Sequence, residues 1–215
     1  MQIQDGIGRK RLTVFDLDGT LLDYRAEEHS AALNVCGMLA SRCGRTSDEV
    51  LATYTNSKQA GRKLPAAEDQ LGFRFRHLCL ELGIDPLEAT ALKRSYVEWR
   101  LAACRVLVGA LVMIDVFANQ SDQMAVLTNG DDDVQKARIA AAGLDKHFAR
   151  IYSSQRIGYA KPEPMAFAFV QTDLGLGPAQ WRIVGDNPQV DLAVPKQLGV
   201  ETWQVEQESE IVKRW

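Results

Sequence analysis

Strand-like runs are distributed very unevenly along this sequence, and that distribution limits the folds available to it. One short run rich in β-branched and aromatic side chains, residues 12–15, lies near the start, and the others all lie in the second half. The later runs occupy residues 124–127, 150–152, 182–184 and 202–205, with helix-compatible stretches at 134–142 and 165–174. Short strands that alternate with helices predict a parallel sheet covered on both faces.

The long segment between the first two runs has a different character. It shows no strand pattern but four helix-compatible stretches, at residues 26–42, 48–57, 67–82 and 87–105. Residues typical of helix ends separate them: Ser47 or Asp48 as a start, Gly44 and Gly83 as stops, and Asp85 with Pro86 opening the last stretch. One continuous mixed domain is the alternative.

The pattern favours two domains. We expect a Rossmann-like α/β core at residues 11–23 and 106–215, with an all-helical domain inserted at residues 24–105. Residues 1–10 are polar and are expected to form a loose tail.

Composition excludes several classes of protein. Lys and Arg number 25 and Asp and Glu number 28, so the net charge of −3 gives no electrostatic reason to expect a nucleic acid polymer as partner. Apolar residues make up 46% of the chain, which is too many for a disordered protein. The longest apolar run, residues 106–114, is far shorter than the roughly 20 residues of a membrane-spanning helix. We therefore expect a globular protein that does not act on a membrane.

The cysteines and the N-terminal residues indicate the compartment. Cys36, Cys43, Cys79 and Cys104 lie in helix-compatible segments without Cys-x-x-Cys spacing, and the three histidines do not fall at zinc-ligand spacings around them. The N-terminal residues lack the apolar stretch of a signal peptide. Together these features indicate reduced thiols in a cytoplasmic protein.

Acidic residues follow the first predicted strand directly, in the sequence Asp16-Leu17-Asp18-Gly19-Thr20. Ligands of open α/β sheets bind at the carboxyl ends of strands. An extended backbone would aim Asp16 and Asp18 the same way, and a cation would relieve their mutual repulsion. Mg²⁺ suits such a site because it prefers a few carboxylates together with phosphate oxygens. Taken alone, the motif is explained equally well as a strand that ends in a polar turn.

Polar residues also follow the second core strand. Thr128 and Asn129 offer a hydroxyl and backbone N–H groups that can bind phosphate oxygens, although a simple turn into a helix is the alternative. The next three acids, Asp131, Asp132 and Asp133, are expected to cap that helix and to complement its dipole.

A lysine and two further acids follow the later strands. Lys161 stands next to Pro162, where a constrained cation could hold a phosphate, although most such lysines lie on the surface. Asp186 comes directly after a strand and could complete a magnesium site. Asp191 lies close to a helix start, where an acid is favourable without any further role.

In this order the motifs resemble those of the haloacid dehalogenase (HAD) superfamily. The resemblance extends from Arg11 to about Val205, and the helical insertion resembles the small helical cap of that superfamily. An acid two residues after the nucleophile, here Asp18, is typical of its phosphatases and absent from its dehalogenases. Leu127–Gly130, Gly143–Phe148 and Gly158–Pro162 resemble the branch that contains the YjjG-type nucleoside 5′-monophosphatases and the N-acylneuraminate-9-phosphatases.

The resemblance implies a Mg²⁺-dependent phosphomonoesterase that hydrolyses a small phosphorylated metabolite, a nucleoside monophosphate or a sugar phosphate, through an aspartyl-phosphate intermediate. Asp16 would be the nucleophile, and Asp18 would be the general acid and base. Because the reference pKa of an aspartate is about 3.9, Asp16 is expected to need no activating base.

The resemblance also assigns the ligands of this site. Thr128, Asn129 and Lys161 would bind the substrate phosphate. Asp16, the Asp18 main-chain carbonyl and Asp186 would hold Mg²⁺. Asp191 would orient Lys161 or a metal-bound water. Val194 and Pro195 stand where the family usually has a small Gly-Ala pair, which could bend the chain there or crowd the floor of the site.

Other functions fit parts of the pattern. A phosphomutase of the same superfamily would return the phosphoryl group to a sugar, and the motifs do not exclude it. A signalling receiver domain also surrounds a phosphorylated aspartate with acids, a Thr and a Lys, but receivers lack both the second acid and the helical insertion. A catalytically silent scaffold is disfavoured because every core acid is present.

Specificity is expected from the inserted helical domain, whose side chains would close over the site. Its candidates are Tyr54, Lys58, Arg74 and Phe75. Helix packing for Phe75 and a solvated face for the charged residues are the simpler interpretations. The sequence carries no signal for the oligomeric state.

Overall fold

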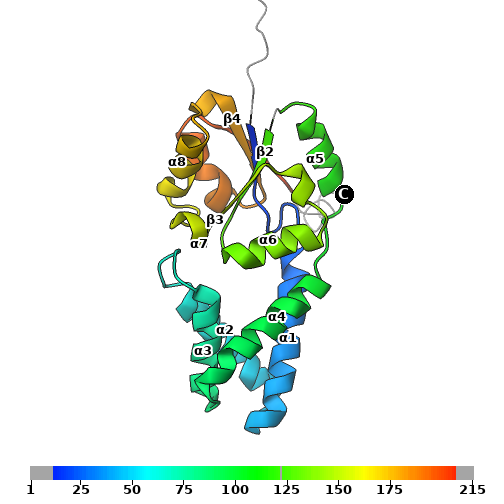
Figure 1. The fold of residues 1–215 in the computed structure, drawn as a ribbon, viewed down its shortest axis with the longest axis vertical. Coiled ribbons are helices and arrows are strands. Elements are labelled where there is room, and N and C mark those ends of the chain that lie inside the picture. The colour runs from blue at the N-terminus through cyan, green and yellow to red at the C-terminus, as the bar shows by residue number, and fades with distance from the viewer. Residues whose placement is uncertain (1–11, 122, 207–215) are drawn as a thin grey trace, which may run out of the picture.

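Five parallel strands form one sheet in the described part of the chain, and this sheet lies in the upper half of the molecule in Figure 1. The computed structural model describes residues 12–121 and 123–206, so the tail expected at residues 1–10 lies outside the described residues. The strands are β1 (Leu12–Phe15), β2 (Gln123–Thr128), β3 (Arg150–Ser153), β4 (Trp181–Gly185) and β5 (Glu201–Gln204). They correspond closely to the five runs found in the sequence, and the predicted α/β fold with a parallel sheet is confirmed.

The first strand of the chain lies at the centre of the sheet. The strand order is β3-β2-β1-β4-β5, and Leu12 is in register with Gln123 of β2 and with Trp181 of β4. Every residue of β1 is buried. Because neighbouring strands are parallel and in register, the carboxyl ends of β1, β2 and β4 meet at one edge of the sheet.

Helices cover both faces of the sheet. The helices of the core are α5 (Ala110–Ala118), α6 (Asp132–Ala141), α7 (Ser154–Ile157), α8 (Pro164–Asp173) and α9 (Ala193–Gln197). Side chains alternate across β1: Phe15 packs with the apolar residues of α5 and α6, whereas Val14 packs with those of α8. The sheet is therefore buried on both faces, as its near-continuous apolar strands predict.

Short turns of helix lie between β1 and β5, the first of them between β1 and α5 and the other three around the sheet. Three are single 3₁₀ turns or extensions, and one is a π-helical turn; they are η1 (Pro86–Glu88), η2 (Asp145–His147), η3 (Pro178–Gln180) and η4 (Pro188–Leu192). The π-helical turn η4 follows β4 directly and carries Asp191.

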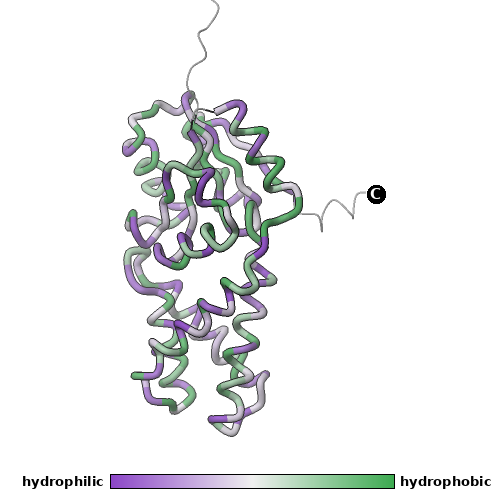
Figure 2. The backbone as a smooth tube through the Cα atoms, turned by 45° about the vertical axis from the view of Figure 1, so that its right-hand side comes forward, coloured by the Kyte–Doolittle hydropathy of each residue, from purple (hydrophilic) through white to green (hydrophobic). Residues whose placement is uncertain are grey.

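The chain between β1 and α5 forms a bundle of helices that extends away from the sheet (Figure 1). We call this bundle, α1 (Tyr24–Cys43), α2 (Ser47–Gly61), α3 (Gln70–Leu82) and α4 (Ala89–Ala102), the helical lobe. Its helices alternate between hydrophobic and hydrophilic residues (Figure 2), as amphipathic helices do. Residues such as Leu39, Phe75 and Tyr96 form a hydrophobic core of its own, which one core-helix residue, Val134, also joins.

The ends of the lobe helices test the boundary predictions. Gly44 and Gly83 end α1 and α3 in the left-handed conformation, as expected. The expected start of α2 at Ser47 or Asp48 is wrong, because Thr46 is the N-cap. Thr46 and Glu49 bond to each other's backbone N–H groups in a capping box, which fixes the helix start one residue earlier. Asp69 caps α3, so that helix begins later than the sequence pattern suggested.

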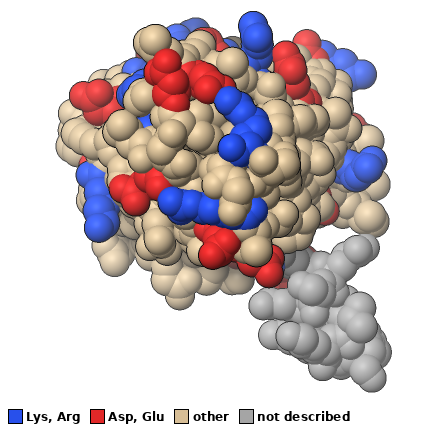
Figure 3. All heavy atoms as spheres, turned by 90° about the horizontal axis from the view of Figure 1, so that it is seen from below, with Lys and Arg blue, Asp and Glu red and all other residues tan. Residues whose placement is uncertain are grey.

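The distribution of surface charge and the free cysteine thiols are those expected from the sequence. Viewed from the end of the helical lobe, basic and acidic side chains are interspersed on one face (Figure 3). All four cysteines are free, and Cys36 and Cys79 are buried. Among the described residues, the helices are too short or too polar to cross a bilayer.

Candidate active site

Asp16 follows the central strand and lies at the meeting point of the strand ends. Its backbone N–H donates to the carbonyl of Val184 in β4 at 2.8 Å, which fixes the loop to the sheet. The Thr20 hydroxyl donates to Asp16 Oδ2 at 2.9 Å and accepts from the backbone N–H of Asp186 at 3.0 Å. Thr20 therefore joins the loops after β1 and β4, a role that the sequence did not reveal although Thr20 is part of the motif.

Lys161 reaches the same point from the loop before α8. Its Nζ lies 2.6 Å from Asp16 Oδ1 and 2.8 Å from Asp191 Oδ1, and all three side chains are buried. The Asn129 side chain holds the lysine backbone: Oδ1 accepts from the Lys161 N–H, and Nδ2 donates to the Lys161 carbonyl, each at 2.8 Å. The side chain of Asn129 thus positions Lys161, and phosphate binding by Asn129 stays a prediction.

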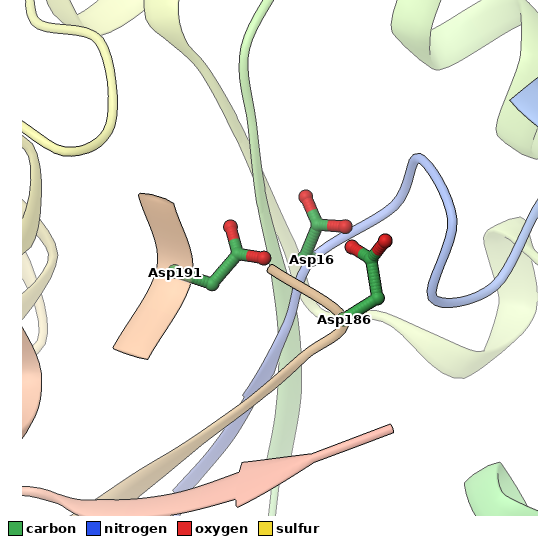
Figure 4. Close-up of side chains that lie close together, drawn as sticks. All are labelled: Asp16, Asp186 and Asp191. Atoms are coloured by element: carbon green, nitrogen blue, oxygen red, sulfur yellow. The ribbon is translucent and has the colours of Figure 1, made fainter. Parts of the chain in front are cut away.

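Three carboxylates gather around this lysine. Asp16, Asp186 and Asp191 each offer an oxygen atom within 4.8 Å of the other two. Figure 4 shows that they come from the end of β1, the loop after β4 and the following turn. When ionised they carry three negative charges, and Lys161 supplies one positive charge. This donor set fits a hard divalent cation such as Mg²⁺, because oxygen ligands and two remaining negative charges are what that ion requires.

The glycine at the end of β4 makes this arrangement possible. A Cβ atom at Gly185 would lie 2.6 Å from Asp191 Cβ and 2.7 Å from Asp191 Oδ2, far inside van der Waals contact. Asp191 Oδ2 accepts from the Asn187 N–H at 3.0 Å. The turn therefore folds Asp191 back against the strand end, even though Val194 and Pro195 replace the small pair that the sequence comparison expected.

Burial changes the acidity of Asp16. Loss of solvent raises the pKa of the Asp16 carboxyl to about 7; Lys161 opposes this rise, whereas the negative charges of Asp191 and Asp18 add to it. Burial therefore opposes the ionisation of Asp16, and the expectation that Asp16 needs no activating base stays a prediction. A cation beside the carboxylate would favour its ionised form.

Asp18 does not join the carboxylate cluster, contrary to the expectation that Asp16 and Asp18 point the same way. The strand ends at Phe15, so the extended geometry does not continue through the motif. Asp18 Oδ1 instead lies 2.6 Å from Arg138 Nη2, and Gln135 Nε2 donates to Asp18 Oδ2 at 3.3 Å. Both partners belong to α6.

Gln135 also orients Thr128. Its Nε2 donates to Thr128 Oγ1 at 2.6 Å. Because the hydroxyl oxygen accepts this bond, its hydrogen is directed elsewhere and can be donated to a ligand oxygen.

Arg138 connects the site to the helical lobe. This fully buried arginine of α6 forms two hydrogen bonds with Glu27 of α1, which is also fully buried, at 2.7 and 2.5 Å. Arg100 of α4 lies 3.3 Å from the same carboxylate. Sequence reasoning missed Glu27, Arg100 and Arg138, because charged residues in helical stretches are indistinguishable there from a solvated face.

One cavity of about 1120 Å³ lies between the sheet edge and the lobe. Every core residue to which a site role was assigned lines it: Asp16, Asp18, Thr128, Asn129, Lys161, Asp186 and Asp191. Of the four lobe candidates, only Arg74 does. Phe75 is lobe core, as its simpler interpretation predicted, and Lys58 forms an ion pair with Glu28.

The three acids after β2 match their predicted role at the start of α6 only in part. Asp131 is the N-cap residue of α6, but its side chain makes no capping hydrogen bond. It lies 3.8 Å from Lys93 of the lobe instead. Asp132 accepts a hydrogen bond from Ser153 at 2.7 Å. Side-chain capping by Asp131 is therefore not found, whereas Asp132 and Asp133 lie in the first turn of α6, where their charges complement the helix dipole as expected.

Several known proteins are similar to this chain in sequence. Phosphoserine phosphatase of Thermus thermophilus is 38% identical over 77 residues, which are 36% of this chain and 31% of that protein, so the chain spans about a third of it. Pyrimidine 5′-nucleotidase PynA of Streptococcus pneumoniae is 22% identical over 89% of this chain and 82% of its own length. Human N-acylneuraminate-9-phosphatase is 24% identical over 87% of this chain and 78% of its own length. The nucleotidase and the N-acylneuraminate-9-phosphatase match the branch that the sequence resembled.

A solved structure has the same fold. HAD-hydrolase YfnB of Bacillus subtilis superposes with a TM-score of 0.70 at 20% identity, over 96% of this chain and 98% of that one. The family model of haloacid dehalogenase-like hydrolases matches residues 10–199, which include the whole acidic cluster, Lys161 and the helical lobe. The chain therefore belongs to the haloacid dehalogenase-like hydrolases and is an enzyme of that family.

Proposed function

We propose that this enzyme is a Mg²⁺-dependent phosphomonoesterase that hydrolyses a small phosphorylated metabolite through a phosphorylated Asp16. The observation that carries the proposal is the contact of Asp16 with Lys161 at the floor of a cavity that Thr128, Asp18 and Asp186 also line. Relatives named as a nucleotidase, a sugar-acid phosphatase and a phosphoserine phosphatase support a phosphate ester as substrate. We place the enzyme in the cytoplasm.

Different residues of the chain carry out the binding, attack and proton-transfer steps of the reaction. Lys161 and the Thr128 hydroxyl attract the phosphate oxygens and orient the phosphorus toward Asp16. An Asp16 oxygen attacks phosphorus and the bond to the ester oxygen breaks. The departing alkoxide takes a proton from Asp18, which must first leave its contact with Arg138 and take up that proton from water. Asp18, now ionised, then takes a proton from a water that attacks the phosphorylated Asp16 and releases phosphate.

Mg²⁺ would be held by Asp16, Asp186 and the Asp18 main-chain carbonyl, and when bound it would neutralise the repulsion between the carboxylates and the phosphate. Asp191 would act on Lys161, which it contacts at 2.8 Å. The similar Bacillus subtilis structure was solved with magnesium bound and showed interdomain movement, which supports both a metal here and a mobile helical lobe. We propose residues 24–105 as that mobile cap and residues 11–23 and 106–215 as the core.

Phosphate release tests the proposal. The pure protein should hydrolyse p-nitrophenyl phosphate with Mg²⁺, lose activity in EDTA and regain it when Mg²⁺ is restored. Asp16→Asn should lower kcat on the order of 10⁴-fold because it removes the nucleophile. Asp115→Asn, an exposed acid on α5, is the matched control and should keep full activity.

Three outcomes would contradict the proposal. If Asp16→Asn retained a tenth of the activity or more, Asp16 would not be the nucleophile. If the wild-type protein released no phosphate from a broad panel of esters but isomerised a sugar phosphate in a coupled assay, the phosphomutase alternative would replace the proposal. A phosphorylated Asp16 that persisted for hours without turnover would favour the receiver-like switch.

A further inference from the structure

The wall of the cavity that faces the acidic cluster is basic. Four residues of the helical lobe that line the cavity are arginines: Arg25, Arg62, Arg74 and Arg100. No Asp or Glu from residues 24–102, all of which the structure describes, lines it. The substrate phosphate is already served by Lys161 on the opposite side. The positive charge of the lobe wall is therefore complementary to a second negative group on the ligand.

Arg74 is held rigidly in this wall. Its Nη1 donates to the hydroxyl of Tyr54 at 3.0 Å and to that of Tyr96 at 3.5 Å. Its guanidinium carbon lies 5.6 and 5.9 Å from the centroids of the same two rings. These contacts orient the planar guanidinium before any ligand binds, so little side-chain entropy remains to be lost on binding.

Arg74 also has bonding capacity that the protein does not use. Its Nε is buried, and within the described part of the chain it has no hydrogen-bond partner. The ion pairs among those residues do not include Arg74. A buried N–H without a partner destabilises the protein, and a carboxylate or phosphate oxygen is the partner that a guanidinium fork fits best.

The neighbouring cations are not equivalent to Arg74. Arg100 has buried Nε and Nη2 atoms without hydrogen-bond partners within the described residues, but its charge is paired with that of Glu27 at 3.3 Å. Lys58 forms an ion pair with Glu28. Arg62 directly follows α2 and is exposed at the cavity, and no ion pair to it is found within the described residues. Arg74 inside the wall and the exposed Arg62 and Arg25 at the cavity are thus the lining arginines without an ion pair within the described residues.

We propose that Arg74 and Arg62 form a second anion site, and that the substrate is a phosphomonoester whose alcohol part carries a carboxylate or a second phosphate. This inference rests on the proposed phosphatase function, because it places the reacting phosphate at Asp16 and the second anion at the lobe. A cavity of about 1120 Å³ has room for both groups at once.

Matched pairs of substrates test the site. Ethyl phosphate is compared with phosphoglycolate, and propyl phosphate with 3-phosphooxypropanoate and with propane-1,3-diol bisphosphate. In each pair we expect the ester with the second anion to have a kcat/KM about tenfold higher or more, which is the effect of one charge-assisted hydrogen bond. The carboxylate and bisphosphate arms show which anion the site prefers.

Variants locate the effect on the two arginines. Arg74→Gln and Arg62→Gln should each lower the ratio of charged to uncharged kcat/KM by about tenfold, and Arg74→Lys should lower it less than Arg74→Gln. Arg76→Gln is the matched control, since Arg76 lies two residues along α3, is exposed and does not line this cavity. If Arg74→Gln loses the circular dichroism melt of a folded protein, the exposed Arg62→Gln decides the result.

Binding separates this inference from the proposed function. Calorimetry compares propane-1,3-bisphosphonate with propylphosphonate, neither of which can be hydrolysed. Tighter binding of the bisphosphonate, lost in Arg62→Gln, supports the anion site even if no ester is turned over. Equal binding of both, or p-nitrophenyl phosphate turnover without any preference for charged esters, overturns the anion site while leaving the phosphatase proposal intact. An equal loss on all esters in Arg74→Gln would also overturn it, because Arg74 would then act on the reacting phosphate.

Discussion

The sheet edge and the helical lobe line the same cavity with opposite charge and by different means. At the sheet edge, carboxylates stand on loops fixed by strand ends, and Asp16, Lys161 and Asp191 bond to one another. In the lobe, arginines such as Arg74 stand on helices that share a separate hydrophobic core and are braced by tyrosines. Hydrogen bonds from the strand-end loops fix the groups at the sheet edge, whereas the inner surface of the lobe belongs to a separately packed helix bundle. The difference supports our proposal that the chemistry takes place at the sheet edge and that the lobe selects the ligand.

Substitution of Arg138 is the strongest test of this division, because the side chain contacts Asp18 at the sheet edge and Glu27 in the lobe. Arg138→Met would leave the buried carboxylate of Glu27 with only Arg100 nearby. We expect the free energy of unfolding, measured by urea denaturation, to fall by about 3–5 kcal/mol. The double variant Glu27→Gln with Arg138→Met should recover part of the loss, because it removes both charges. A loss below about 1 kcal/mol in the single variant would mean that Arg100 alone neutralises Glu27.

Substitution of Gly185 tests how precisely Asp191 and Lys161 must be placed at the sheet edge. Gly185→Ala would place a methyl group 2.6 Å from Asp191 Cβ, so the turn and Lys161 must shift. Because misplacement by about 1 Å can cost a hundredfold, we expect kcat for p-nitrophenyl phosphate to fall about 100-fold. Gly37→Ala, in the middle of α1 with nothing within 4 Å, is the control in the lobe and should raise stability by about 0.5–1 kcal/mol. Full activity in Gly185→Ala would show that the site tolerates movement of Asp191.

Asn129 tests positioning against binding. Asn129→Ala removes both hydrogen bonds to the Lys161 backbone, and we expect kcat to fall about tenfold with little change in KM, because the lysine is less well placed. Asn119→Ala, at the end of α5, is the control and should behave like wild type. A raised KM with unchanged kcat would instead support the phosphate-binding role expected from the sequence.

The smallest effect is expected from an ion pair inside the lobe. Although burial opposes it, the contact with Lys58 holds the pKa of Glu28 below its ordinary value. The pair therefore stabilises the folded protein above about pH 4.3, and this stabilisation is lost as the pH falls through the lowered pKa. Glu28→Gln should lower the free energy of unfolding by about 1 kcal/mol or less at pH 7 and by nothing near pH 2. Glu81→Gln, an exposed acid on α3, serves as the pH-matched control, and a Glu28→Gln effect that did not vary with pH would contradict the assignment.

Much of the fold could be predicted because it depends on local patterns of residues in the sequence. The five strands were found from short apolar runs, since buried parallel strands must be apolar on both faces. Gly44 and Gly83 were found as helix stops because few other residues adopt the left-handed conformation there. The start of α2 was missed by one residue, because choosing Thr46 depends on a reciprocal bond with Glu49 that several neighbouring polar residues could have made instead.

The sequence by itself determined which groups stand at the strand ends, because motif spacing along the chain fixes Asp16, Thr128, Lys161 and Asp186 relative to their strands. Only the tertiary structure decided what those groups contact. It turned Asp18 toward Arg138, placed Asn129 on the Lys161 backbone, raised the pKa of Asp16 by burial and brought Arg74 to the cavity wall. Each of these depends on partners distant in sequence, and a charged residue shows no local sign of the partner that folding will give it.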